Sequence, residues 1–139
     1  MSEAVVDTNV LVHAVVEDSP KHGEARLLLA RLKRWILPTI VLYELVWVLR
    51  KLGVSPEEAQ RILEGILSNP RVEVVTDDGG YARKALRALL GEGRSLAHFN
   101  DKVVATVAMS KGIPLATYDE ELRREASRWG LPTLPAQET

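Results

Sequence analysis

Short apolar runs alternate along this chain with longer stretches in which apolar residues recur every three or four positions. The short runs, typical of buried strands, lie at about 4–7, 35–37, 72–75, 114–117 and 131–134. The longer stretches predict helices at about 9–16, 20–33, 40–49, 56–67, 81–90, 101–111 and 120–129. Strands that alternate with helices indicate a parallel sheet with right-handed crossovers and helices on both faces.

Residue types that favour helix ends and turns mark the boundaries of these elements. They predict N-terminal caps at Ser19, Thr39, Ser55, Asp77 or Asp78, and Asn100. Within the helix at 81–90 we expect Leu86, Leu89 and Leu90 to face inward, and the glycine-containing segment 91–95 to form a flexible loop. The prolines around the last strand place it at an edge of the sheet.

Composition narrows the class of protein. The chain has 139 residues, of which 46% are hydrophobic and 27% charged, and we expect one domain over residues 1–139. It has no cysteine, which excludes disulfides, thiolate zinc sites and a cysteine nucleophile. No basic segment followed by a long apolar run opens the chain, so we expect a cytoplasmic protein. The formal net charge of −1 neither favours nor excludes a nucleic-acid partner.

Four carboxylates stand at informative places in this pattern. Asp7 and Asp119 follow the first and fourth strands, and ligands of open parallel sheets bind at the carboxyl ends of strands. Glu44 interrupts a helix that is otherwise apolar, where a lone charge is costly unless it is paired or bound to metal. Asp101 begins a helix after a loop, although an acid at a helix start or strand end is also a common cap.

If these carboxylates converge, their chemistry suits a hard divalent cation. Mg²⁺ and Mn²⁺ take oxygen ligands, and few of these need to come from the protein. Two such ions about 4 Å apart can activate water and stabilise the leaving oxygen of a phosphodiester.

The segments around these acids carry a family resemblance. The segments are Val5–Leu11, Pro38–Leu45, Asn100–Ala108 and Pro114–Asp119. With them the chain resembles the PIN-domain ribonucleases, and more narrowly the VapC-type toxins of prokaryotic toxin–antitoxin pairs. The resemblance implies a three-layer α/β/α PIN-like fold with a central, mostly parallel sheet of four or five strands.

The resemblance also implies a Mg²⁺- or Mn²⁺-dependent endoribonuclease, the toxin of a type II pair. Its metal would be ringed by Asp7, Glu44, Asp101 and Asp119. Thr8 and Thr117 would orient carboxylates through their hydroxyls, and Asn9 would hold Asp7 or a water. The implied partners are RNA, an antitoxin protein and a second copy of the chain. The apolar helix around Glu44 is expected to pack on the sheet and against either another helix or a second copy of the chain, and the second case agrees with a homodimer.

Three further residues are candidates for substrate binding. Arg94 has the guanidinium fork that matches phosphate oxygens, and His98 lies in the loop before Asp101. Lys102, beside that acid, could reach a phosphate or only solvent. We expect Trp35 and Trp47 in the core or a dimer interface, and Arg123, Arg124 and Arg128 on a solvated helix face.

Two other functions stay open at this point. The chain could be a non-catalytic PIN-like protein-interaction module or a housekeeping nuclease of RNA processing. A phosphoryl-transferring receiver or phosphatase is disfavoured, because no aspartate follows two residues after Asp7 and no lysine ends the fourth strand.

Overall fold

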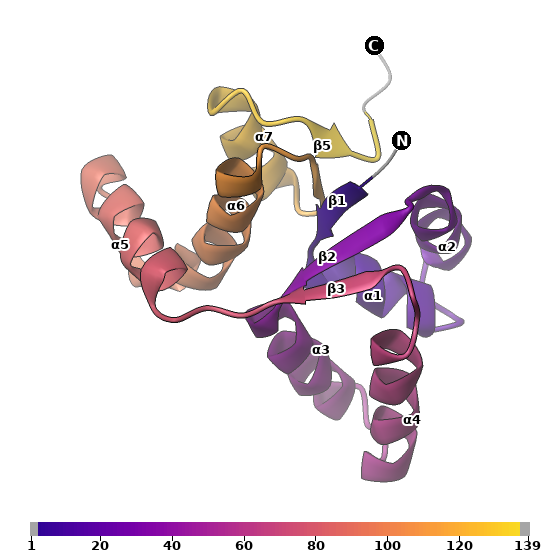
Figure 1. Cartoon of the computed structure of the whole chain (residues 1–139). Helices are drawn as coiled ribbons and strands as arrows, with labels where there is room; N and C mark the ends of the chain where they lie inside the picture. The colour runs from indigo at the N-terminus through magenta and orange to yellow at the C-terminus, as the bar shows by residue number, and fades with distance from the viewer. Residues whose placement is uncertain (1–2, 137–139) are drawn as a thin grey trace.

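The computed structural model describes residues 3–136 and contains a five-stranded sheet in the order β3-β2-β1-β4-β5 (Figure 1). Its strands are β1 (Glu3–Val6), β2 (Arg34–Pro38), β3 (Val72–Val75), β4 (Leu115–Ala116) and β5 (Thr133–Leu134). Every neighbouring pair is parallel, and β5 lies at an edge as expected from its prolines.

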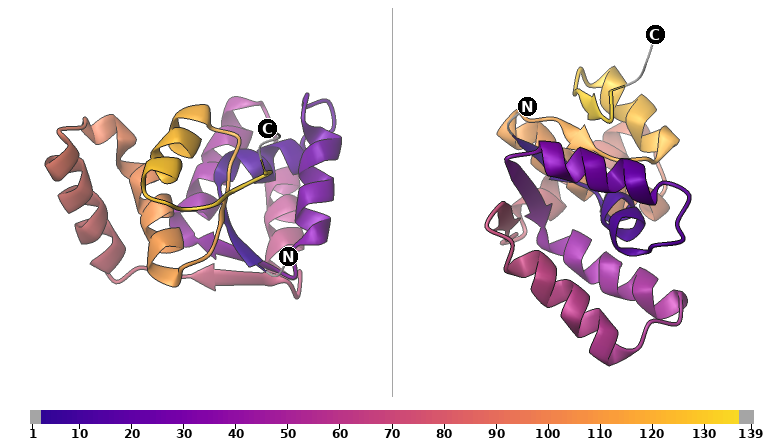
Figure 2. Two further views of the ribbon diagram at one scale, coloured as in Figure 1. Left: turned by 90° about the horizontal axis from the view of Figure 1, so that it is seen from above. Right: turned by 90° about the vertical axis from the view of Figure 1, so that its right-hand side faces the viewer.

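Seven α-helices and one short 3₁₀ helix connect these strands in the described part of the chain. The helices are α1 (Thr8–Val15), α2 (His22–Arg31), α3 (Thr39–Lys51), α4 (Pro56–Leu67), α5 (Gly80–Glu92), η1 (Leu96–His98), α6 (Phe99–Lys111) and α7 (Glu120–Arg128). Figures 1 and 2 show helices on both sides of the sheet, which confirms the predicted α/β/α layers. Among residues 3–136, no helix combines the length and the apolar content that a membrane span requires.

The order in which successive strands are added to the sheet reverses at β1, and this reversal defines a crevice. β1 pairs with β2 on one side and with β4 on the other, so the connections wind away from it in opposite directions. Val5 and Val6 of β1 and Leu115 of β4 are fully buried in the core. The carboxyl ends of β1 and β4 therefore meet at a topological switch point, where open α/β sheets bind their ligands.

Some helix starts differ from the sequence predictions because tertiary partners outcompete local caps. Ser19 contacts His13 Nδ1, and α2 begins only at His22. Thr39 donates its hydroxyl to Val75 O at 3.0 Å, and α3 is preceded by Pro38 at its N-cap. The predictions for Ser19 and Thr39 as caps are thus wrong.

Other local predictions hold in part. Ser55 caps α4 by accepting from the Glu58 amide. The N-cap of α5 is Gly79 and neither Asp77 nor Asp78, so that cap prediction is wrong, although Asp77 accepts from three backbone amides at the start of this helix. Within α5, Leu89 is buried as expected. The expectation for Leu86 and Leu90 is wrong, since they are 48% and 82% exposed in the single chain.

The segment 91–95 is more ordered than a flexible loop. α5 continues to Glu92, and Gly93 ends it with φ +64°, a conformation that glycine adopts without strain. Arg123 also departs from the sequence expectation of a solvated side chain. It is 5% exposed, and its guanidinium donates to Thr117 O and Pro135 O.

Candidate active site

Asp7 occupies the centre of the crevice, directly after β1. The residue is 3% exposed, and its carboxylate accepts three hydrogen bonds from neighbours on both sides of the switch point. Oδ1 accepts from the Thr8 amide at 2.9 Å, and Oδ2 accepts from Asn9 Nδ2 at 3.1 Å and Thr117 Oγ1 at 2.8 Å. These bonds fix the orientation of the carboxylate.

Glu44 approaches the same crevice from α3. Its Oε1 accepts from Thr8 Oγ1 at 3.0 Å, and its Oε2 accepts from Asn100 Nδ2 at 3.1 Å. Asn100 lies inside α6, whose N-cap is His98, so its predicted capping role is wrong. The amide instead ties the start of α6 to α3.

Asn9 and Thr117 join the ends of β1 and β4. Asn9 Nδ2 donates to Thr117 Oγ1 at 3.0 Å, and its Oδ1 accepts from the Tyr118 amide at 2.8 Å. Thr117 Oγ1 also accepts from the Asp119 amide at 3.1 Å. Sequence reasoning selected Thr8, Asn9 and Thr117 as residues that hold carboxylates, and the structure places all three in this network.

A cavity of about 260 Å³ opens over these side chains and is called the acidic pocket below. Its lining residues are Asp7, Thr8, Asn9, Val12, His13, Glu44, Val48 and Asp101. Three of the four carboxylates chosen from the sequence thus face one space. Asp119 does not line it and instead caps α7 by accepting from the Leu122 amide at 3.1 Å.

The carboxylates disfavour one another's charge. Burial, together with the charges of Asp101 and Glu44, raises the pKa of Asp7 to about 7 against the opposing hydrogen bonds from Thr117 and Thr8. Burial also raises the pKa of Asp101 to about 6, helped by Asp119 and Glu44. Asp119 therefore lies near enough to influence the pocket although it does not line it.

The donor set of the acidic pocket fits a hard divalent cation. Its charged groups are carboxylates, and neither lysine nor arginine lines it. Such a cation would neutralise the repulsion that raises the two pKa values. As the side chains lie, however, no three acids or histidines within residues 3–136 are gathered tightly enough to hold an ion.

The three substrate candidates chosen from the sequence belong to a different environment. Lys102 is enclosed, with Nζ 2.7 Å from Glu92 Oε1, paired with Glu125 and 4.3 Å from the Trp129 ring centroid. Contrary to expectation, it reaches neither the acidic pocket nor solvent in this structure.

Arg94 joins the same buried cluster. It bonds Glu125 at 2.9 Å and Glu121 at 2.6 Å, and its Nη2 lies 3.1 Å from His98 Nδ1. The guanidinium is thus committed to carboxylates of α7 rather than left open to a phosphate. His98 is half-buried beside it and does not line the acidic pocket.

Two polar residues at or beside the pocket were not selected from the sequence as site residues. Asn100 holds Glu44 from 56 positions away, and its place directly before Asp101 was the only local signal. His13 forms part of the pocket wall, and burial together with Lys21 lowers its pKa. The helical spacing of Asn9 and His13 could have pointed to a shared face.

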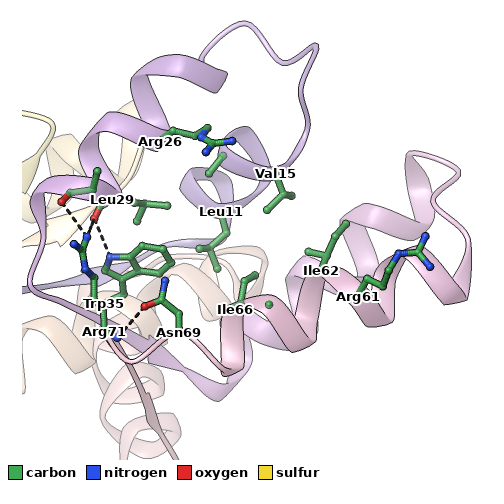
Figure 3. Close-up of a pocket in the computed structure, with 13 residues that line it drawn as sticks. Leu11, Val15, Arg26, Leu29, Trp35, Arg61, Ile62, Ile66, Asn69 and Arg71 are labelled. Carbon is green, nitrogen blue, oxygen red and sulfur yellow. Dashed lines mark hydrogen bonds between the residues drawn. The ribbon is translucent and has the colours of Figure 1, made fainter.

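A second cavity, of about 430 Å³, lies between α1, α2 and α4 (Figure 3). Leu11, Ile62 and Ile66 project toward it, and Trp35 closes one end with its indole nitrogen bonded to Leu29 O at 2.9 Å. No carboxylate lines this cavity, so it suits apolar side chains rather than a metal.

Comparisons with known proteins agree on the fold. A model of the PIN domain matches residues 4–127. The structure is similar to Mycobacterium tuberculosis VapC20, a sarcin–ricin loop cleaving toxin, with TM-score 0.74 and 19% identity over 90% of this chain and 95% of that chain. It is also similar to VapBC2 from Rickettsia felis bound to a DNA fragment from their promoter, with TM-score 0.64 and 24% identity over 96% and 97% of the two chains. No curated protein matches this sequence.

Proposed function

The chain belongs to the PIN domain family, and we propose that it is a metal-dependent endoribonuclease that hydrolyses RNA phosphodiester bonds at the acidic pocket. The observation that carries the proposal is the meeting of Asp7, Glu44 and Asp101 at the switch point without a lysine or arginine among the lining residues. A buried carboxylate group of this kind is costly for stability alone, and such clusters mark functional sites.

We propose that Asp7, Glu44 and Asp101 hold Mg²⁺ or Mn²⁺, with Asp119 at the margin. When bound, the ion lowers the pKa of a water and stabilises charge on the phosphate. Asp7 is already oriented by three donors, whereas Asp101 makes no side-chain hydrogen bond in the described part of the chain. Metal binding therefore requires movement of the part-exposed Asp101, which no side-chain hydrogen bond among the described residues holds, toward Asp7 and Glu44.

The remaining polar residues have supporting roles in this proposal. Thr8 and Asn100 hold opposite oxygens of Glu44, and Asn9 and Thr117 hold one oxygen of Asp7. Restricting these carboxylates before metal arrives reduces the entropy that binding must spend on ordering them. His13 forms a wall against which substrate can lie.

We also propose that the protein is the toxin of a type II pair, bound by an antitoxin protein. The support is the likeness of the fold to VapC20 and VapBC2. The apolar cavity of Figure 3 gives an antitoxin segment a place to bury apolar side chains, with Arg26 at its margin to pair with an acid. Such docking leaves the acidic pocket to be covered by a separate contact.

A homodimer is the third part of the proposal. Tyr43 and Trp47 of α3 are 68% and 54% exposed in the single chain, and Leu90 of α5 is 82% exposed. Large apolar side chains exposed to this extent are typical of an interface. A second copy would cover them and account for the apolar composition of α3.

The test is cleavage of a mixed, structured RNA pool by wild type and Asp7→Asn with EDTA, Mg²⁺ or Mn²⁺. We expect cleavage only by wild type and only with metal. Asp18→Asn is the matched control, because Asp18 is exposed and does not line the pocket. A folded Asp7→Asn protein that cleaves RNA as fast as wild type would refute the assignment. A wild type that neither cleaves RNA in the pool nor binds metal in calorimetry would instead favour the interaction module, whereas metal binding without cleavage would mean that the pool lacks the RNA target.

A further inference from the structure

We propose that the arginine groove binds phosphates of the RNA strand that flanks the cleaved bond. The groove is the cavity of about 570 Å³ lined by Arg123, Arg124, Ser127, Arg128 and residues 131–133 and 136. This inference rests on the proposed ribonuclease function and adds a path for its substrate. It also gives a role to the exposed arginines of α7, which the catalytic proposal does not use.

Among residues 3–136, no acidic side chain neutralises the positive charge that the groove presents. Arg124 and Arg128 are exposed and four residues apart, so their guanidinium groups lie on one face of α7. No carboxylate lines the groove, and neither arginine forms an ion pair within residues 3–136. Arg34, by contrast, is paired with Glu73 at 3.2 Å. Two unpaired guanidinium forks on one face suit the oxygens of a phosphate.

The groove adjoins a third, smaller hollow, and one wall residue of that hollow contacts a wall residue of the acidic pocket. Arg123 and Ala136 line both the groove and a cavity of about 190 Å³, which is also lined by Lys21 and Tyr118. The Tyr118 ring packs edge-on against His13, with 5.4 Å between centroids, and His13 lines the acidic pocket. A strand that leaves the pocket past His13 thus meets Tyr118 and then the arginines.

The length and charge of this path suit single-stranded RNA. From its cap at Asp119 to Arg128, α7 rises by about 14 Å, enough for a few nucleotides. In the middle hollow, Glu24 and Glu120 offset Lys21, which lies 3.7 Å from Glu24. Lys21 Nζ also lies over the Tyr118 ring, 5.1 Å from its centroid, so a base would have to displace this lysine to stack there. We therefore place the phosphate contacts at the two ends of the path.

The test compares two double variants with matched chemistry. Arg124→Gln/Arg128→Gln removes both groove charges, and Arg83→Gln/Arg87→Gln removes two exposed arginines with the same spacing on α5. The probe is a fluorescein-labelled single-stranded RNA of about 12 nucleotides. Its binding is measured by anisotropy in EDTA, which prevents metal-dependent cleavage, over a series of salt concentrations.

We expect the groove variant to bind the probe about tenfold more weakly at roughly 0.1 M salt. The steepness with which its log affinity decreases against log salt should be smaller by about 1.4 than for wild type, because two phosphate contacts are lost and each contributes about 0.7 on single strands. The α5 variant should keep both values. Each single groove substitution should give about half the slope change, and unchanged urea midpoints should show that the variants fold.

Cleavage with Mn²⁺ gives the second measurement. The groove variant should raise KM about tenfold and leave kcat within about twofold, because the lost contacts lie away from the reacting bond. Equal binding and equal salt slopes for wild type and the groove variant would overturn the groove while leaving the nuclease intact. Arginine-dependent binding by a protein that cleaves no RNA would support the groove and count against the nuclease. A wild type that does not bind the probe would also overturn the groove, and cleavage of the structured RNA pool would then decide the nuclease separately.

Discussion

The raised pKa of Asp7 makes the stability of the metal-free protein depend on pH. Burial and neighbouring acids raise this pKa from 3.8 to about 7, so the folded state holds a proton that the unfolded state releases. The associated stability is present below pH 3.8 and is lost as pH rises through 7. A difference of one in pKa corresponds to about 1.36 kcal/mol. The free energy of unfolding therefore falls by about 4 kcal/mol in total, of which about 3 kcal/mol is lost between pH 5 and pH 8.

Asp7→Asn removes this dependence while keeping the size of the side chain. The new amide would face the donors Asn9 Nδ2 and Thr117 Oγ1, and the lost hydrogen bonding costs about 1–2 kcal/mol at any pH. The variant should therefore match wild type in stability near pH 5. Near pH 8 it should be more stable by about 2–3 kcal/mol, because wild type then buries a charge.

Urea unfolding in EDTA at pH 5 and pH 8 measures both differences. Asp18→Asn serves as the control, because Asp18 is exposed and outside the pocket, and it should change little at either pH. The result that would refute the reasoning is a stability change for Asp7→Asn that is equal at the two pH values. That result would mean that Asp7 is charged at pH 5 in the folded protein and that its burial is compensated.

Four other outcomes follow from the structure. Mn²⁺ at about 100 times its Kd should stabilise wild type at pH 8 by about 3 kcal/mol and should not stabilise Asp7→Asn, as thermal unfolding can show. Lys102→Met should lower the free energy of unfolding by about 3–5 kcal/mol, because it removes one partner of the buried Glu125. The control Arg34→Met breaks the exposed ion pair with Glu73 and should lower the free energy of unfolding by less than about 1 kcal/mol. Thr8→Val should slow RNA cleavage about tenfold by releasing Glu44, and Thr8→Ser should restore the rate; equal rates for the two variants would contradict the role of the hydroxyl. Tyr43→Ser/Trp47→Ser should shift a wild-type dimer to monomer in sedimentation, and an unchanged dimer would place the interface elsewhere.

The buried cluster around Lys102 links the helices that carry the site. Lys102 follows Asp101 at the start of α6, and Glu125 lies on α7, which begins at Asp119. Glu125 pairs with both Lys102 and Arg94, so one carboxylate joins α6, α7 and the segment after α5. This arrangement explains why two cations expected near substrate are internal: they hold together elements whose aspartates repel each other.

Local sequence determined the order of elements and the ends of β1 and β4. The runs around Val5 and Leu115 are apolar over the length of a strand and are too short for a buried helix. Asp7 and Asp119 follow those runs directly, so their position at the carboxyl edge needed only the parallel topology. The Ser55 cap was equally local, since its partner is the Glu58 amide.

Tertiary structure decided which polar residues meet. Asn100 has the residue type of a cap, yet its amide binds Glu44 on another helix, and Thr39 likewise binds Val75 instead of capping α3. Lys102 and Arg124 are both basic residues on helices, but one is enclosed and the other exposed. Sequence patterns report the preference of a residue for its own segment, whereas burial and pairing depend on side chains that only folding brings within reach. The four carboxylates could therefore be recognised from the sequence. The packing of α3, α6 and the strand ends decided that three of them share one pocket.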